Sequence, residues 1–321
     1  MYPGGSTVAV DTSASRNSDI LTAFMSEVLN DFPVDNRTVL NPTLDHLKQN
    51  ARIKSWGRQA YCPIYTGTNT TGGYYSGYDE FDATPQSAAR SVNYAMVNWG
   101  QTVVVNDEEL TETKGDRHKI YDLVKFKKQV AEDTCFDDLN EDCYAAAPAA
   151  DELNSLAVMI DSTGSCGDLS ATTDAQWASV ENAGGVFTAQ GYADMITMYN
   201  DLKANKSHPS AVMTTQAIHE LYELEHNVDV RYGDPKMAGK RGVKELFFKD
   251  IPILWDDDCT AGVMYFLNNK HLFLAIESSQ NFQFDPFAKP VKQKAQISLF
   301  HVRLQIMCDK RNAQGKITGI S

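Results

Sequence analysis

The chain has 321 residues, of which 42 are Asp or Glu and 29 are Lys or Arg, so its net charge is -13. This length accommodates one elaborate domain or two, and the acidic balance argues against an overall nucleic-acid-binding surface. No apolar run reaches the roughly 18 residues of a membrane span, and no amino-terminal run has the order of a signal peptide. We therefore expect a chain that is cytosolic where it is made.

The first 50 residues read as an arm. Residues 1–17 are rich in Gly, Ser, Thr and Asn, with little apolar surface to hold them. An apolar stripe that includes Phe24 and Leu29 then predicts a short amphipathic helix ending before Pro33. Residues 31–50 are predicted to be extended, with one helical turn near Leu44, and could lie as a strap over another subunit.

Residues 51–107 have the pattern of a long hairpin. Two extended limbs flank residues 66–82, which contain four glycines beside Tyr74, Tyr75 and Tyr78. Tyrosine offers a large contact area at low entropic cost and recurs at protein interfaces. We expect this tip to contact another protein surface, with a mobile solvent loop as the alternative.

Residues 116–147 predict one long helix, because apolar residues recur at spacings of three, four and seven. Asp116 can cap its start and Pro148 helps to stop it. At the helical rise it would span about 45 Å, so it can serve as a spine.

The rest of the chain alternates between predicted strands and helices, which indicates an α+β fold. We expect strands at 154–160, 209–214 and 246–254, helices at 188–202 and 215–226, a hairpin at 262–276 that turns at 268–270, and half-buried strands over 282–306 that pack against the spine.

The six cysteines stand singly, without a Cys-x-x-Cys pair. We expect all of them to be buried, reduced thiols. Cys135 and Cys143 share a face of the predicted spine, but eight helical residues separate them by about 12 Å, which is too far for a disulfide.

Two stretches could carry metal chemistry. His219 and His226 lie on one predicted helix, but their spacing of seven puts them about 10 Å apart along its axis, whereas a zinc peptidase needs a spacing of four. His219 and Glu223 could hold a zinc with a distant third ligand, although a charged outer helix face is the preferred interpretation.

The second stretch is residues 256–258, three consecutive aspartates after a predicted strand. They lack the alternating spacing of a calcium loop, so a solvated turn is favoured. The sequence also has no phosphate-binding loop, nucleophile elbow or dinucleotide-binding turn. We therefore predict no catalytic residues, no metal and no cofactor; a metal-dependent hydrolase is the enzymatic alternative.

The order of arm, hairpin, spine, α+β region and returning strands resembles the major capsid proteins of tailed, double-stranded DNA bacteriophages, whose fold is shared with the floor of herpesvirus capsids. Short stretches are similar to one branch of that family: residues 75–79, 212–218, 251–253, 264–268 and 311–317. The resemblance covers roughly residues 50–321.

The resemblance implies a division into an N-terminal arm (1–50), an extended E-loop hairpin with flanking strands (51–107), a P-domain spine helix (108–153), an A-domain (154–280), and P-domain strands with a C-terminal tail (281–321). It places the loop at 227–242 at the A-domain tip, around the centre of each pentamer or hexamer. The candidate inter-subunit contacts are Tyr74, Tyr75, Tyr78, Phe24, Leu29, Arg231, Lys236 and Arg241.

The resemblance also implies what the protein assembles with. Copies of the chain would form pentamers and hexamers of an icosahedral capsid, assembled in the host cytoplasm with a scaffolding protein and a portal, and enclosing double-stranded DNA without sequence-specific binding. No membrane is implied. Covalent crosslinking is not expected, because Lys54 is the only lysine on the hairpin limbs. Another self-assembling virion component, such as a tail or tube, is the alternative, although the long helix is unlike the small β-barrels of tail tubes.

Overall fold

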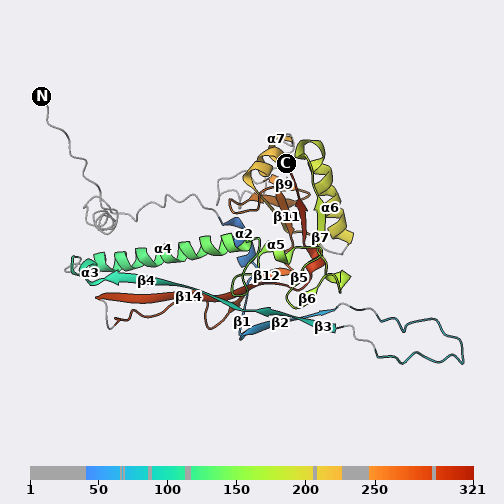
Figure 1. Cartoon of the computed structure of the whole chain (residues 1–321), viewed down its shortest axis with the longest axis horizontal. Helices are drawn as coiled ribbons and strands as arrows, with labels where there is room; N and C mark the ends of the chain where they lie inside the picture. The colour runs from blue at the N-terminus through green and yellow to red at the C-terminus, as the bar shows by residue number, and fades with distance from the viewer. Residues whose placement is uncertain are drawn as a thin grey trace. The chain divides into compact units, whose positions relative to one another are not determined.

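A computed structural model describes residues 41–65, 67, 69–85, 89–112, 117–204, 208–225, 246–290 and 294–321 (Figure 1). The described residues divide into two compact units: one holds Gln101–Thr134 and Phe284–Phe300, and the other holds residues 41–100, Cys135–Gln283 and His301–Ser321. The candidate contacts Phe24, Leu29, Arg231, Lys236 and Arg241 lie outside the described residues.

The predicted long helix is confirmed as α4, which spans Arg117–Cys143. Its 27 residues extend over about 40 Å at the helical rise. Among its apolar residues, Leu123, Ala131, Cys135, Leu139 and Cys143 are buried, and their spacings of eight and four keep them on one face. Val130, another apolar residue of α4, is 40% exposed.

The first unit combines the start of α4 with strand segments. These are the end of β4 (Val97–Asn106) and the beginning of β14 (Ala295–Cys308), which pair, while α3 (Asp107–Glu112) follows β4 directly. Val103 and Val105 are buried and the intervening Val104 is exposed, as expected for a strand with one covered face.

The second unit contains a mixed six-stranded sheet in the order β7-β15-β11-β8-β10-β9. Its strands are β7 (Val180–Ala183), β8 (Ala211–Thr214), β9 (Leu246–Phe248), β10 (Ile251–Trp255), β11 (Val263–Leu267) and β15 (Gly315–Thr318). Helix α6 (Tyr192–Ala204), preceded by a π-helical turn at Phe187–Gly191, and helix α7 (Gln216–Glu225) share one apolar core with this sheet, centred on Met195, Met198, Val212, Ile253 and Phe266. The predicted helices at 188–202 and 215–226 and the strand at 209–214 are therefore confirmed.

A second sheet has the order β1-β12-β14-β13, with β4 also pairing with β14. Strand β1 (Arg52–Lys54) runs parallel to β12 (Leu272–Glu277), and β13 is Gln283–Phe284. Every residue of β12 is buried. Helix α2 (Pro42–Lys48), which confirms the predicted turn near Leu44, packs on β12 and buries Leu44 and Leu47. The strands expected over 282–306 are confirmed as β13 and β14, but their alternation is confirmed only in part. Phe300, Val302 and Leu304 are buried at every second position, whereas Leu299 is 40% exposed and every residue from Leu304 to Cys308 is buried.

The hairpin is confirmed by strands β2 (Gln59–Tyr65) and β3 (Ala89–Ala95), which pair antiparallel from Gln59 opposite Ala95 to Tyr65 opposite Ala89. The loop that joins them extends away from these strands (Figure 1). A small hairpin follows later in the chain, made by β5 (Ser165–Cys166) and β6 (Leu169–Ser170).

One predicted hairpin is wrong. The turn at residues 268–270 exists, but β11 and β12 lie in different sheets rather than pairing with each other. The Asn268 N–H donates to Gln314 Oε1 (2.7 Å) and the Asn269 N–H donates to Ser210 Oγ (2.9 Å), so the turn is fixed to neighbouring segments. Both strands are largely buried on two faces, which lets each join a separate sheet.

Two further expectations are corrected. Residues 154–160 do not form a strand: Leu156–Met159 is the short helix α5, and the Ser155 side chain accepts from the Val158 N–H at its start. The expected single strand at 246–254 is the pair β9 and β10. Lys249 and Asp250 between them both have positive φ (47° and 67°), as a two-residue type I′ turn requires. Among the described helices, none is long and apolar enough to cross a bilayer.

Candidate assembly surfaces

The tip of the long hairpin presents aromatic side chains to solvent. Tyr74 and Tyr78 are fully exposed and Tyr75 is 68% exposed. Phe81 is also exposed, and its ring centroid lies 5.0 Å from that of Tyr75. Residues 66–88 contain three acidic residues and no Lys or Arg. The structure thus leaves an aromatic, acidic segment in water, which is unusual for a chain that functions alone.

Local hydrogen bonds shape this tip. Asp79 Oδ2 accepts from the Ser76 N–H (2.7 Å), while the Asp79 N–H donates to the Ser76 carbonyl (2.8 Å). Asp82 accepts from the Thr84 N–H and hydroxyl, and these bonds lower the pKa of its carboxyl. Turns held in this way keep their own shape without support from a core.

Exposed aromatic surface continues along β2. Tyr61 and Tyr65 are 58% and 72% exposed, whereas the alternate residues Ala60, Cys62 and Ile64 are buried. The outward face of β2 therefore extends the surface of the tip toward the hairpin base.

The His219 stretch does not form the outer helix face that the sequence favoured. His219 is buried on α7 together with Ile218 and Tyr222. Burial lowers the pKa of His219, and the nearby carboxylates of Glu223 and Glu220 oppose that shift. His226 lies outside the described residues. Across the described parts of the chain, no group of three or more His, Cys, Asp or Glu side chains could hold a metal ion.

The aspartate turn is also not simply solvated. Asp257 is exposed, but Asp256 is only 1% exposed. Asp256 Oδ1 accepts from Asn140 Nδ2 (2.9 Å) and from the Asp258 N–H (3.1 Å), and Asp256 Oδ2 accepts from the Thr43 N–H (3.4 Å). Burial raises the pKa of Asp256, and these hydrogen bonds oppose the shift. Through these hydrogen bonds the Asp256 carboxylate, at the end of β10, connects α2 with the end of α4. Its role is therefore structural.

The six thiols are free and buried, as predicted. Burial raises the pKa of Cys62 to about 11 and that of Cys259 to about 12. These thiols are therefore protonated and poorly reactive at neutral pH.

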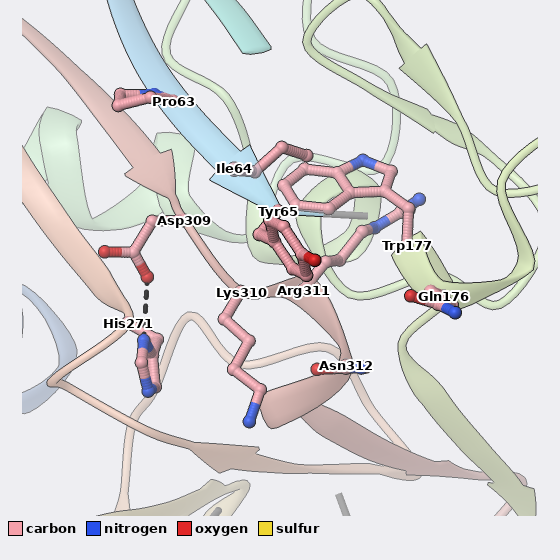
Figure 2. Close-up of a pocket in the computed structure, with 10 residues that line it drawn as sticks. All are labelled: Pro63, Ile64, Tyr65, Gln176, Trp177, His271, Asp309, Lys310, Arg311 and Asn312. Carbon is pink, nitrogen blue, oxygen red and sulfur yellow. Dashed lines mark hydrogen bonds and ion pairs between the residues drawn. The ribbon is translucent and has the colours of Figure 1, made fainter. Parts of the chain in front are cut away.

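A groove of about 340 Å³ lies beside the end of β2 (Figure 2). Ile64, Tyr65 and Trp177 line one part of it, and the pair of His271 Nδ1 and Asp309 Oδ1, 2.8 Å apart, lines another. None of the candidate inter-subunit contacts lines this groove, but Arg311 and Asn312 do, and they belong to the stretch 311–317 on which the resemblance rests.

Comparison with known proteins gives matches only at the level of structure. No family model matches the sequence, and no curated protein matches it. The capsid asymmetric unit of cyanophage A-1(L) matches with a TM-score of 0.69 and 16% identity, covering 93% of this chain and 98% of that chain. The capsid of Myoviridae phage XM1 matches with a TM-score of 0.55 and 11% identity, covering 99% of this chain and 100% of that one.

An encapsulin complex from Synechococcus elongatus also matches, with a TM-score of 0.58 and 7% identity, covering 98% of this chain and 97% of that chain. Together these likenesses show the fold class: the chain is an α+β protein that matches nearly the whole length of these capsid and encapsulin chains. More particularly, the chain has the fold of tailed-phage capsid proteins, so the predicted fold is confirmed.

Proposed function

We propose that this chain is the major capsid protein of a tailed, double-stranded DNA bacteriophage. The observation that carries the proposal is the match to a phage capsid subunit over 93% of the chain, with a TM-score of 0.69. Copies of the chain would form the pentamers and hexamers of an icosahedral shell, and the role is structural rather than enzymatic.

The exposed hairpin supports this assignment. A subunit that occupies both pentamers and hexamers needs several modest contacts that adapt to different geometries. The aromatic tip, with Tyr74, Tyr75 and Tyr78, offers such a contact surface. In this proposal residues 51–107 are the E-loop that lies over a neighbouring subunit, residues 108–153 and 281–321 make the P-domain, and residues 154–280 make the A-domain.

Other contacts and partners belong to the same proposal. Phe24 and Leu29 of the arm (1–50) would contact neighbouring copies, as would Arg231, Lys236 and Arg241 of the A-domain tip. A scaffolding protein and a portal would take part in assembly in the host cytoplasm, and the finished shell would be part of the virion. The net charge of -13 suits a container whose wall must let packaged DNA slide.

An encapsulin-type assembly is a second candidate, because an encapsulin complex matches 98% of the chain. A tail or tube component is the third, and it predicts open rings or tubes. Particle shape separates tubes from shells, and nuclease-protected DNA inside particles purified from infected cells separates a phage capsid from an encapsulin-type shell.

The first test is negative-stain electron microscopy of the purified chain, alone and with a scaffold partner, alongside light scattering. Closed particles, or free pentamers and hexamers, are the expected result. A chain that stays a 35.6 kDa monomer under both conditions would refute the proposal.

A further inference from the structure

The base of the long hairpin is held along one edge. In an antiparallel pair, alternate residues direct their backbone groups away from the partner strand. On β3 two of these groups are bound outside the hairpin: the Asn93 N–H donates to Asp168 Oδ1 (3.0 Å), and the Ala95 carbonyl accepts from Gln305 Nε2 (3.0 Å). The Asn93 side chain adds a third bond, from Nδ2 to Asp168 Oδ2 (2.7 Å).

The turn that carries Asp168 is built to approach β3 closely. Gly167 and Asp168 are the two turn residues of the β5–β6 hairpin, and Gly167 has a φ of +64°. A Cβ at Gly167 would lie 2.4 Å from Val92 Cγ1 and 2.9 Å from the Asn93 carbonyl oxygen. Both the backbone conformation and the contact with β3 therefore require glycine at this position.

The chain segment that leads into this turn is anchored on its other side. The guanidinium of Arg311 is fully buried and donates to three backbone carbonyls: Val158 (2.9 Å), Met159 (2.8 Å) and Gly164 (2.7 Å). Trp177, also buried, donates from Nε1 to the Cys166 carbonyl (3.3 Å). The segment that touches the hairpin is thus fixed to the second unit.

Two more contacts extend along β3. Arg90 Nη1 lies 2.7 Å from Asp174 Oδ2, and the buried Tyr94 hydroxyl donates to the Cys308 carbonyl (2.9 Å). Of the six residues from Arg90 to Ala95, four are therefore bonded to groups outside the hairpin. The tip differs, because Asp79 and Asp82 bind groups only two or three residues away.

We propose that residues 161–178 form a brace that sets the direction of the hairpin base, so that the hairpin bends beyond Tyr65 and Ala89 rather than at its root. This inference rests on the proposed function, since the brace would orient the hairpin, and the hairpin is the surface proposed to contact a second copy of the chain. The β2–β3 base would keep one direction in pentamers and hexamers, and the tip would absorb the difference between them.

Hydrogen exchange of the full-length, unassembled chain tests the brace. Asp168→Ala removes both bonds to Asn93, and exchange over 89–95 is expected to rise at least about tenfold, since hydrogen bonds to a charged acceptor are worth that factor or more. The strands of the six-stranded sheet should keep their protection. Asp79→Ala is the matched control, because it removes a carboxylate that bonds only within the tip.

Equal exchange over 89–95 in the wild type and in Asp168→Ala would overturn the inference. If Asp168→Ala does not fold, Arg90→Ala releases only the pair with Asp174, and unchanged exchange over 89–91 would then overturn it. Neither readout depends on particle formation. A chain that forms no particles refutes the proposed function and leaves the brace to be judged by exchange alone.

Electron spin resonance measures the direction itself. Spin labels at Ser91→Cys and Glu220→Cys, both exposed positions, should give a narrow distance distribution in the otherwise wild-type chain and a broader one with Asp168→Ala. A broad distribution before the substitution would show that the hairpin pivots at its root and would overturn the inference.

Discussion

Asn140 offers the sharpest test of how the spine is joined to the sheet. Its Nδ2 donates to Asp256 Oδ1 (2.9 Å) and to Asp258 Oδ2 (2.7 Å), while its Oδ1 accepts from the Leu44 N–H (3.3 Å). Asn140→Asp keeps the size of the side chain and the oxygen that accepts from Leu44, but it removes the amide donor. It also places a third carboxylate beside those of Asp256 and Asp258. The substitution therefore isolates the electrostatic role of one amide group.

The expected cost can be worked from these distances. Two charges about 3 Å apart repel by about 5 kcal/mol at an effective dielectric constant of 20. The protein can escape by protonating the new carboxyl, which costs about 4 kcal/mol at pH 7 for a group whose unperturbed pKa is about 3.9. Protonation thus limits the charge penalty, and one lost hydrogen bond to a carboxylate adds about 1.5 to 3 kcal/mol. We expect Asn140→Asp to lower the free energy of unfolding by about 5 to 7 kcal/mol near pH 7.

The destabilisation caused by Asn140→Asp should change with pH in a definite direction. The new carboxyl would have a pKa in the folded chain above its value in the unfolded chain, so the native state binds a proton that the unfolded chain has lost. Its destabilising effect is largest at high pH and shrinks as the pH falls, by about 1.4 kcal/mol per pH unit. Burial raises the pKa of Asp256 as well, so that carboxyl also favours the native state more as the pH falls.

Equilibrium urea unfolding, followed by tryptophan fluorescence between about pH 7 and pH 5.5, measures this difference. Asn200→Asp is the control, because it makes the same chemical change at an exposed position of α6 and should stay within about 0.5 kcal/mol of the wild type. Adding Asp256→Asn to Asn140→Asp should restore much of the stability by exchanging donor and acceptor. A deficit that is small near pH 7, or that does not change with pH, would refute the reasoning.

Three other outcomes follow from features described above. Changing Tyr74, Tyr75 and Tyr78 together to Ser should leave the unfolding free energy within about 0.5 kcal/mol, because they are exposed, but should reduce particle yield in light scattering at least about tenfold; normal assembly would contradict their role. Arg311→Met should cost about 3 to 6 kcal/mol in thermal unfolding, since three carbonyls lose their donor, and Arg311→Lys should recover only part of it. A thiol reagent near pH 8 should leave the native chain unmodified for much longer than the denatured chain, because Cys62 and the other thiols are buried and the pKa of Cys62 is raised to about 11; rapid modification of even one thiol would contradict this.

The sequence predicts the features that depend on local pattern. The spacing of apolar residues marks α4 to within a few residues, and the alternation over Ala60, Cys62 and Ile64 marks β2. The exposed tyrosines of the tip follow from glycine-rich composition alone. Each of these signals lies within one element, so no knowledge of its tertiary partners is needed.

The errors arise where distant segments decide the outcome. A turn at residues 268–270 between two apolar runs is typical of a hairpin, yet the choice between pairing and separation depends on β8, β14 and β15, which complete the two sheets. Lys249 and Asp250 are not the Asn-Gly pair that is typical of a two-residue turn. The sequence pattern therefore predicts one strand where the structure has β9 and β10.

The sequence predicts a solvated turn at residues 256–258, and the burial of Asp256 departs from that prediction for a similar reason. Asp256 is buried because Asn140, 116 residues earlier, supplies a donor, and no local pattern reveals that pairing. His219 was placed outside because the acids around it dominate the sequence pattern, whereas α7 turns Ile218, His219 and Tyr222 inward.

The parallel pairing of β1 with β12 sets the order in which the protein can be completed. Arg52 lies opposite Ala275, so 275 minus 52, or 223 residues, separate the two partners along the chain. At ribosomal rates of about 5 to 20 residues per second, β1 waits roughly 10 to 45 s for its neighbour. The strand that carries the hairpin therefore docks only when the chain is nearly finished. A chain that ends before β12 would leave β1 without its partner strand, so the region that carries the hairpin could not reach its native arrangement.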